Sequence, residues 1–333
     1  MSRAQGERVK VALIGAGGWG EQHARVFSQS ELAELCAIVG RTPERTAERA
    51  ERYGTRAYTS IGEMIEKEKP DLVSICLPNQ DHYEATMEVI EAGVPLFVEK
   101  PLVFDLGEAE RLLAAAAERK LFFGINFNHR YAKPMRLAKS KHDAGALGDP
   151  VFATWRFGGE GDGGHPYANL IETQCHGFDS LEYLLGPISS VMAEMTEMTG
   201  KGFSTMSIAL RFASGAVGSL VGSYDSSYAY QDTQRLEVNG TAGRLVIDDT
   251  VRQFRFQQAG SELAETWQAG YFNDRDREFH RTFDAHADVM LKAFLAGEQP
   301  PIHARAGYRA LKLAHAAIES CREGKRIGTL EAD

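Results

Sequence analysis

A glycine pattern that directly follows an apolar run near the N-terminus limits the fold more than any other feature of the sequence. The run Val9–Ile14 has the composition of a buried strand, and Gly15, Gly17 and Gly20 follow it, ahead of a helical stretch at residues 21–29. In this context the first glycine permits a tight turn, the second lets the backbone approach a pyrophosphate, and the third allows close helix packing. The pattern predicts a dinucleotide at the helix N-terminus, and a glycine loop without a ligand is the alternative.

Apolar runs of strand length recur and alternate with helical stretches in the first part of the chain. They cover residues 35–39, 72–77, 96–98 and 121–125. Strands that alternate with helices are typical of a parallel sheet covered on both faces. We therefore expect an α/β protein whose N-terminal domain, residues 1–125, is a doubly wound parallel sheet of the Rossmann type.

The pattern changes after residue 150, where apolar and polar side chains alternate as they do in half-buried strands. Such segments cover residues 150–157, 204–212, 216–223, 234–238, 244–247 and 253–257. A chain of 333 residues also exceeds what one core usually supports. We expect a second α/β domain, residues 126–333, with a large open and predominantly antiparallel sheet and a C-terminal helix that packs back toward the first domain.

Composition and charge exclude several function classes. Lys plus Arg number 37 and Asp plus Glu 46, giving a net charge of −9, and the absence of a long basic run argues against nucleic acid as a partner. No apolar segment approaches the roughly 20 residues that cross a bilayer, so we expect a cytoplasmic protein without a membrane partner. The four cysteines lie far apart without metal-ligand spacing, which predicts reduced thiols and no metal site.

The strand at residues 96–98 ends in Glu99, Lys100 and Pro101. Lys100 would lie at the carboxyl edge of the sheet, where open α/β sheets bind ligands. An amine in a partly desolvated crevice can exchange protons near neutrality, which makes Lys100 a catalytic candidate. The alternative is that Glu99 and Lys100 are solvated residues at a strand end.

The residues after the second strand bear on the choice of cofactor. An acid at this position accepts the ribose 2′-hydroxyl of NAD, but the chain has Gly40, Arg41 and Thr42 instead. The Arg41 guanidinium suits a 2′-phosphate and Thr42 adds a donor, so NADP(H) is favoured over NAD(H). The alternative is a surface pair between Arg41 and Glu44.

A second chemical pattern lies on the predicted helix over residues 169–185. Glu172, His176 and Asp179 stand four and three residues apart, so one helix face would carry two carboxylates and an imidazole suited to proton transfer. Two alternatives remain open. Asn169 and Glu172 fit a capping box, and His176 and Asp179 fit an ordinary surface pair.

The order of these motifs resembles the glucose-fructose oxidoreductase, inositol dehydrogenase and rhizopine-catabolism family (Gfo/Idh/MocA). The resemblance covers nearly the whole chain and rests on the glycine pattern, Pro78-Asn79 with His82, Glu99-Lys100-Pro101, Asn-His-Arg-Tyr at 128–131, Gly148, His176 with Asp179 ahead of Leu184-Leu185-Gly186, residues 239–243 and the helix at 310–324. It implies hydride transfer between nicotinamide C4 and a carbinol or carbonyl carbon of a sugar or polyol. It also implies a homodimer or homotetramer formed through the C-terminal sheet.

The resemblance assigns roles to individual positions. Lys100 corresponds to the family's catalytic lysine, His176 to its acid/base histidine, and Asp179 to an Asp that orients substrate hydroxyls or the histidine. Glu172 stands where the dehydrogenases usually have Asp, and its longer side chain departs from the pattern. The cofactor would be lined by Gly15, Gly17, Gly18, Trp19, Gly20, Arg41, Thr42, Leu77, Pro78, Asn79, His82, Glu99 and Lys100, and the substrate by Lys100, Asn128, Trp155, His176 and Asp179.

Several assignments have alternatives. His82, near a helix start, also fits a structural hydrogen-bonding role. Trp155, Tyr167, Tyr228 and Tyr230 are candidates for stacking on a sugar ring, and packing or subunit contacts are the alternative. For the whole protein, the rival functions are a glycoside hydrolase that uses NAD for transient oxidation and a non-catalytic nucleotide-binding sensor.

Overall fold

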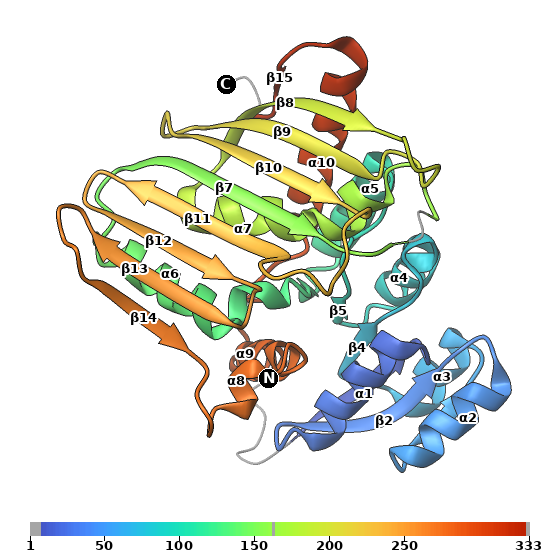
Figure 1. Cartoon of the computed structure of the whole chain (residues 1–333). Coiled ribbons are helices and arrows are strands. Elements are labelled where there is room, and N and C mark those ends of the chain that lie inside the picture. Colours follow the sequence, from blue (N-terminus) through green and yellow to red (C-terminus); the bar gives the residue numbers. More distant parts are fainter. Residues whose placement is uncertain (1–7, 162–163, 331–333) are drawn as a thin grey trace. The chain divides into compact units, whose positions relative to one another are not determined.

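The computed structural model describes residues 8–161 and 164–330, which form two compact units (Figure 1). Unit 1 comprises the described residues up to Asn128 together with Phe283–Arg309. Unit 2 comprises His129–Thr282 and the described residues from Ala310 onward.

Unit 1 is the doubly wound parallel sheet that the sequence predicted. All its strand pairs are parallel, in the order β3-β2-β1-β4-β5-β6. The strands are β1 (Val9–Ile14), β2 (Ala33–Val39), β3 (Arg56–Tyr58), β4 (Leu72–Ile75), β5 (Leu96–Val98) and β6 (Phe123–Ile125). The helices between them are α1 (Gly18–Gln29), α2 (Pro43–Arg52), α3 (Ile61–Glu68), α4 (His82–Glu91), which follows the short turn η1 (Asn79–Asp81), and α5 (Leu106–Glu118). Helices on both faces bury the central strands, which explains their nearly unbroken apolar runs.

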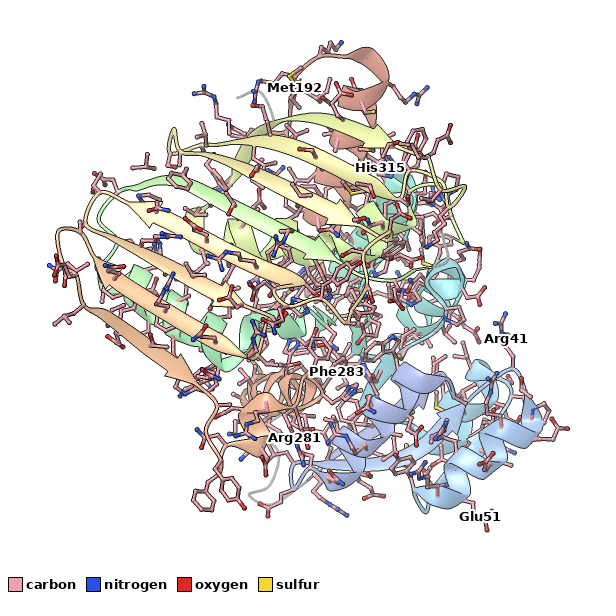
Figure 2. The ribbon with its side chains drawn as sticks, viewed as in Figure 1. Arg41, Glu51, Met192, Arg281, Phe283 and His315 are labelled. Carbon is pink, nitrogen blue, oxygen red and sulfur yellow. The ribbon has the colours of Figure 1, made fainter. Side chains whose placement is uncertain are left out.

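A segment that is distant in sequence completes unit 1. Apart from its first two residues, α9 (Arg281–Ala296) belongs to this unit. Phe283, which is labelled in Figure 2, stacks on Trp19 with ring centroids 5.7 Å apart. His286 Nδ1 lies 2.7 Å from the Asn126 side-chain oxygen. The sequence placed all residues after 125 in the second domain. The structure differs because these buried contacts hold residues 283–309 in unit 1.

Unit 2 contains the expected open sheet, with strand order β14-β13-β12-β11-β7-β10-β9-β8-β15. Every pair is antiparallel except β7 with β10, which is parallel. The strands are β7 (Pro150–Gly158), β8 (Ile188–Thr196), β9 (Thr205–Phe212), β10 (Val217–Ser223), β11 (Gln234–Gly240), β12 (Gly243–Asp248), β13 (Gln253–Gln258), β14 (Ala264–Gln268) and β15 (Ile327–Gly328).

Helices cover one face of this sheet. They are α6 (Lys133–Asp143), α7 (Cys175–Leu185) and the part of α10 (Arg305–Glu323) that belongs to unit 2 (Figure 1). Short helical segments η2 (Asn128–Tyr131) and η3 (Asn169–Thr173) precede α6 and α7, and α8 (Asp274–Arg277) follows β14. Across residues 8–161 and 164–330, no helix is both long and apolar enough to span a bilayer.

Candidate functional site

The glycine turn of unit 1 has the geometry of a phosphate cradle. Gly15 has φ of +127°, and a Cβ there would lie 1.9 Å from the Cys76 carbonyl oxygen. A Cβ on Gly20 would lie 2.1 Å from the carbonyl oxygen of Gly15, so both positions need glycine for packing. Gly17 and Gly18 instead face open space, because a Cβ on either would have nothing within 4 Å. The N-cap residue of α1 is Gly17, which has no capping side chain, so the first amides of α1 suit an anion such as a pyrophosphate.

Arg41 and Thr42 lie directly after β2, as expected. Arg41 pairs with Asp81 at 3.1 Å, and its side chain is 75% exposed (Figure 2). The alternative pair with Glu44 is therefore wrong, because Asp81 of η1 takes the guanidinium. Thr42 is the N-cap residue of α2, and its hydroxyl accepts a hydrogen bond from Arg45.

A buried polar network lies next to Lys100 in unit 1, and we call it the Glu99 network. The Glu99 carboxylate accepts hydrogen bonds from the Lys100 backbone amide at 3.1 Å and from the Asn126 side chain, and lies 2.8 Å from His23 Nε2. The network continues from His23 Nδ1 to the Ser74 hydroxyl at 2.8 Å, and from Asn126 to His286. All its side chains are buried.

The Glu99 network determines the charge of Glu99. Burial, the largest single influence, acts to raise the pKa of the Glu99 carboxyl, but the contacts with His23 and the nearby Lys100 charge together lower this pKa below its ordinary value. The sequence placed Glu99 at the cofactor. Its role at the cofactor stays a prediction: the residue is 7% exposed, and its carboxylate contacts His23, Asn126 and the Lys100 backbone amide.

His82 is also buried. Its two ring nitrogens lie 2.9 and 3.0 Å from the carbonyl oxygens of Pro101 and Leu77, which follow β5 and β4. Burial lowers the pKa of His82. His82 therefore has the structural role that was the alternative: it joins two loops at the carboxyl edge of the sheet. Because it is fully buried, its assignment as a cofactor-binding residue is wrong.

Unit 2 departs from the single helix predicted over residues 169–185. Asn169–Thr173 is a π-helical turn, and α7 begins only at Cys175. The wider turn breaks the 3.6-residue spacing between Glu172 and the other two residues, while His176 and Asp179 stay three residues apart on α7. The pKa of His165 is lowered by burial, and the negative charge of Glu172 opposes this. His176 stacks on His129, and Asp179 accepts hydrogen bonds from Arg130.

Both structural alternatives for this segment are wrong. Asn169 is not a capping residue, because its amide donates to the Ser204 carbonyl at 2.6 Å and its side-chain oxygen accepts from Gln174. His176 and Asp179 are not a surface pair, because they are 6% and 5% exposed.

His176 and Asp179 each meet a residue of η2. The imidazole rings of His176 and His129 are stacked, with centroids 3.8 Å apart and planes 8° from parallel. The Arg130 guanidinium donates to both Asp179 oxygens, at 2.8 and 2.6 Å. Burial raises the pKa of the Asp179 carboxyl, and the Arg130 charge opposes that rise.

The structure corrects the prediction that Trp155 contacts the substrate. The sequence made it a candidate for stacking on substrate, but it is 1% exposed and donates its indole N–H to Gln174 at 3.0 Å. Asn128 is likewise 2% exposed. Tyr167 stacks on Phe203, with ring centroids 5.0 Å apart.

Sequence reasoning missed the partners that hold these groups. His23, Asn126 and His286 were not singled out, and His129 and Arg130 were quoted only as part of the Asn-His-Arg-Tyr motif, without a role. Residues 126–130 directly follow β6, so their place at the carboxyl edge of a strand was an available signal. His286 has no comparable local signal. Within the described part of the chain, no group of three or more His, Cys, Asp or Glu side chains is arranged to hold a metal ion.

Comparisons with known proteins agree with this geometry. Residues 9–127 match the Gfo/Idh/MocA model described as an oxidoreductase family with an NAD-binding Rossmann fold, and residues 138–329 match the model of its C-terminal alpha/beta domain. The myo-inositol 2-dehydrogenase of Thermotoga maritima is 27% identical over 340 residues, which cover 96% of this chain and 98% of that protein. The scyllo-inositol 2-dehydrogenase (NAD(+)) of Bacillus subtilis is 26% identical, with 96% of each chain covered.

Solved structures support the same fold. A levoglucosan dehydrogenase in complex with NADH and levoglucosan matches with a TM-score of 0.88 and 21% identity, over 98% of this chain and 100% of that one.

Proposed function

Because this chain belongs to the Gfo/Idh/MocA oxidoreductase family, with its NAD-binding Rossmann fold, we propose that it transfers hydride between a nicotinamide dinucleotide and a sugar or polyol. The observation that carries the proposal is the arrangement of unit 1. The open glycine cradle follows β1 and Lys100 follows β5, so both lie at the carboxyl edge of one parallel sheet. The inositol dehydrogenases that resemble the chain along its length support a polyol-type substrate.

The proposed chemistry divides between the cofactor and the chain. A bound nicotinamide supplies the hydride acceptor or donor. In the oxidative direction, Lys100 Nζ or the His176 imidazole accepts the proton of the hydroxyl that becomes a carbonyl. In the reductive direction, the same group returns that proton to the carbonyl oxygen. Lys100 as an ammonium also stabilises the negative charge that develops on this oxygen.

The test has two parts. NADH and NADPH are first titrated by fluorescence, and the protein is then supplied with a panel of polyols and keto-sugars while nicotinamide absorbance is followed. We expect saturable cofactor binding and a substrate-dependent absorbance change. Release of an aglycone from a glycoside without net absorbance change would instead support the hydrolase. Cofactor binding without turnover on any substrate would support the sensor.

We further propose that NADP(H) binds more tightly than NAD(H). The proposal rests on the missing acid after β2 and on the exposed Arg41 guanidinium with the neighbouring Thr42 hydroxyl. The relative whose name specifies NAD(+) is the reason for a direct measurement.

Changing Arg41 to Ala should weaken NADPH binding about 10- to 150-fold and leave NADH binding within about twofold, because a charge-assisted pair with the 2′-phosphate is worth about 1.5–3 kcal/mol. Fluorescence titration of both cofactors measures the ratio. The control is Arg322→Ala at the end of α10, which should leave both affinities unchanged. Tighter binding of NADH by the wild-type protein would contradict the proposed preference.

We also propose that two or more copies associate through the face of the nine-stranded sheet opposite α6, α7 and α10. Apolar side chains are exposed along this face, namely Phe152, Met192, Val217 and Val221, each 37–46% accessible (Met192 is labelled in Figure 2). Beside them lie pairs of opposite charge, Arg235 with Asp248 and Arg244 with Glu237. An apolar patch bordered by both signs of charge suits a second copy of the same surface.

A double change of Val217 and Val221 to Glu should convert the oligomer to a monomer, because it places unpaired charges in the proposed interface. Size-exclusion chromatography with light scattering measures the mass. Leu263→Glu is the control, since Leu263 is 83% exposed in the connection between β13 and β14. A monomeric wild-type protein across the concentration range would contradict the proposal.

A further inference from the structure

We propose that His129 is a positioning residue for His176, which fixes the plane of the His176 ring and restricts the stacked pair to one proton. The inference rests on the proposed function only where it concerns turnover. The protonation of the pair is a property of unit 2 itself and can be measured without cofactor or substrate.

The stack is close and nearly parallel. The centroids of the two imidazoles are 3.8 Å apart and their planes differ by 8°. His129 lies on η2 and is 3% exposed, and His176 lies in the first turn of α7 and is 6% exposed. A flat ring at this distance blocks one face of His176, so the ring of His176 can turn only within the plane of the stack.

The residue after His129 fixes the alignment of the two elements. Arg130 donates two hydrogen bonds to Asp179, which is three residues after His176 on α7. A bidentate guanidinium–carboxylate pair fixes direction as well as distance. Consecutive residues of η2 therefore hold consecutive turns of α7, and a shift of one contact would disturb the other.

Three aromatic rings besides His176 lie near the His129 ring. The ring of Phe279 meets it edge-on, with centroids 5.5 Å apart and planes at 88°, and Trp155 and Phe157 lie 6.5 and 6.4 Å away. This surrounding fixes the His129 ring in place. It also offers little solvation to a positive charge on His129, which favours the neutral form of that ring.

The stacking distance limits the pair to one proton. Arg130 and Asp179, which lie beside it on η2 and α7, offset each other in a two-point ion pair. Glu172 lies on η3 four residues before His176, and His280 follows Phe279 in the chain. Two imidazolium rings stacked at 3.8 Å would repel each other strongly, whereas one imidazolium over a neutral imidazole is attracted to its π-face. The pair therefore takes up one proton, which resides on His176.

The first test follows histidine protonation by NMR in the full chain without cofactor. We expect the His176 signal to titrate first, and the His129 signal to remain neutral until the pH is at least about 2 units lower, as for strongly coupled sites. Assignment uses His129→Phe and His176→Gln, each of which removes one of the two signals. Two rings that titrate independently within about one unit would overturn the one-proton restriction.

The second test separates positioning from general packing. His129→Ala removes the stacked ring and should lower kcat about 10- to 100-fold with little change in the KM for cofactor. His129→Phe restores a flat ring that cannot take a proton, and should recover most of this loss together with the wild-type pH profile of kcat/KM. Unchanged kcat in His129→Ala, or equal losses in the Ala and Phe variants, would overturn the positioning role.

The two proposals can fail separately. If His176→Ala retains wild-type turnover, the acid/base role of His176 is wrong, yet the coupled NMR titration would stand. If His129→Ala does not fold, the wild-type titration and the His129→Phe profile still decide the inference.

Discussion

Replacing Lys100 by Met is expected to lower kcat by about 10²- to 10⁴-fold while leaving the dissociation constant of the nicotinamide cofactor within a few-fold. Met keeps most of the length and apolar volume of the side chain but has neither a proton nor a charge for the reacting oxygen. The backbone amide of Lys100, which donates to Glu99, is retained in the variant. Steady-state kinetics and fluorescence titration of the same preparation measure the two effects.

The matched control is Lys292→Met, which removes an exposed lysine of α9 in the same unit. It should leave kcat and cofactor affinity unchanged. A Lys100→Met enzyme with near-normal kcat would contradict the role of Lys100. A variant that no longer binds cofactor would show that Lys100 acts in binding rather than in proton transfer.

A double variant connects Lys100 with His176. If both groups serve the same proton transfer, Lys100→Met combined with His176→Ala should lose little more activity than the worse single variant, because residues that act as a unit are not additive. If their effects multiply fully, the two groups act in separate steps.

The Glu99 network explains why Lys100 is held where it is. Glu99 keeps a lowered pKa in a buried position because His23 and Asn126 contact its carboxylate. The ionised carboxylate then accepts the Lys100 amide and places a negative charge near the lysine. His23 of α1 and Asn126, which follows β6, contact Glu99 at the end of β5 directly, and His286 of α9 contacts Asn126 in turn.

Local sequence patterns predicted much of the fold. The glycine turn after β1 could be predicted because its steric demands involve adjacent strands and helices only, and the structure places Gly15 and Gly20 against neighbouring backbone. The alternation of apolar and polar residues likewise predicted the open sheet of unit 2. Both signals can be recognised from the order of residues within a short stretch of chain, although the Gly15 contact itself is with Cys76.

The remaining features depend on contacts between distant residues. His286 meets Asn126 across 160 positions of sequence, and His23 meets Glu99 across 76. No periodicity reports such pairs. The π-helical turn at 169–173 shows the second limit, because one altered turn changes which side chains share a face although the residue spacing is the same. Glu172 therefore lies outside the regular spacing of α7, whereas His176 and Asp179 both lie on α7 and contact consecutive residues of η2.

Removing Arg130 alone should destabilise unit 2 by about 3–5 kcal/mol, the usual effect of leaving one member of a buried ion pair without its partner. The Asp179 side chain is only 2% exposed and both its oxygens accept hydrogen bonds from Arg130. Arg130→Met would leave this carboxylate buried without its guanidinium, and Asp179→Leu would leave the guanidinium without its carboxylate. The combined variant replaces both charges with apolar groups and should recover most of the stability.

Urea unfolding followed by tryptophan fluorescence measures these changes. In a Trp19→Phe background the remaining tryptophans, Trp155 and Trp267, both belong to unit 2, so the signal reports that unit. The control is Arg252→Met, which breaks a surface pair with Asp232 and should cost at most about 1 kcal/mol. If the two single losses simply add in the combined variant, Arg130 and Asp179 stabilise the protein independently. The alignment of His129 with His176 could then not be attributed to the ion pair between Arg130 and Asp179.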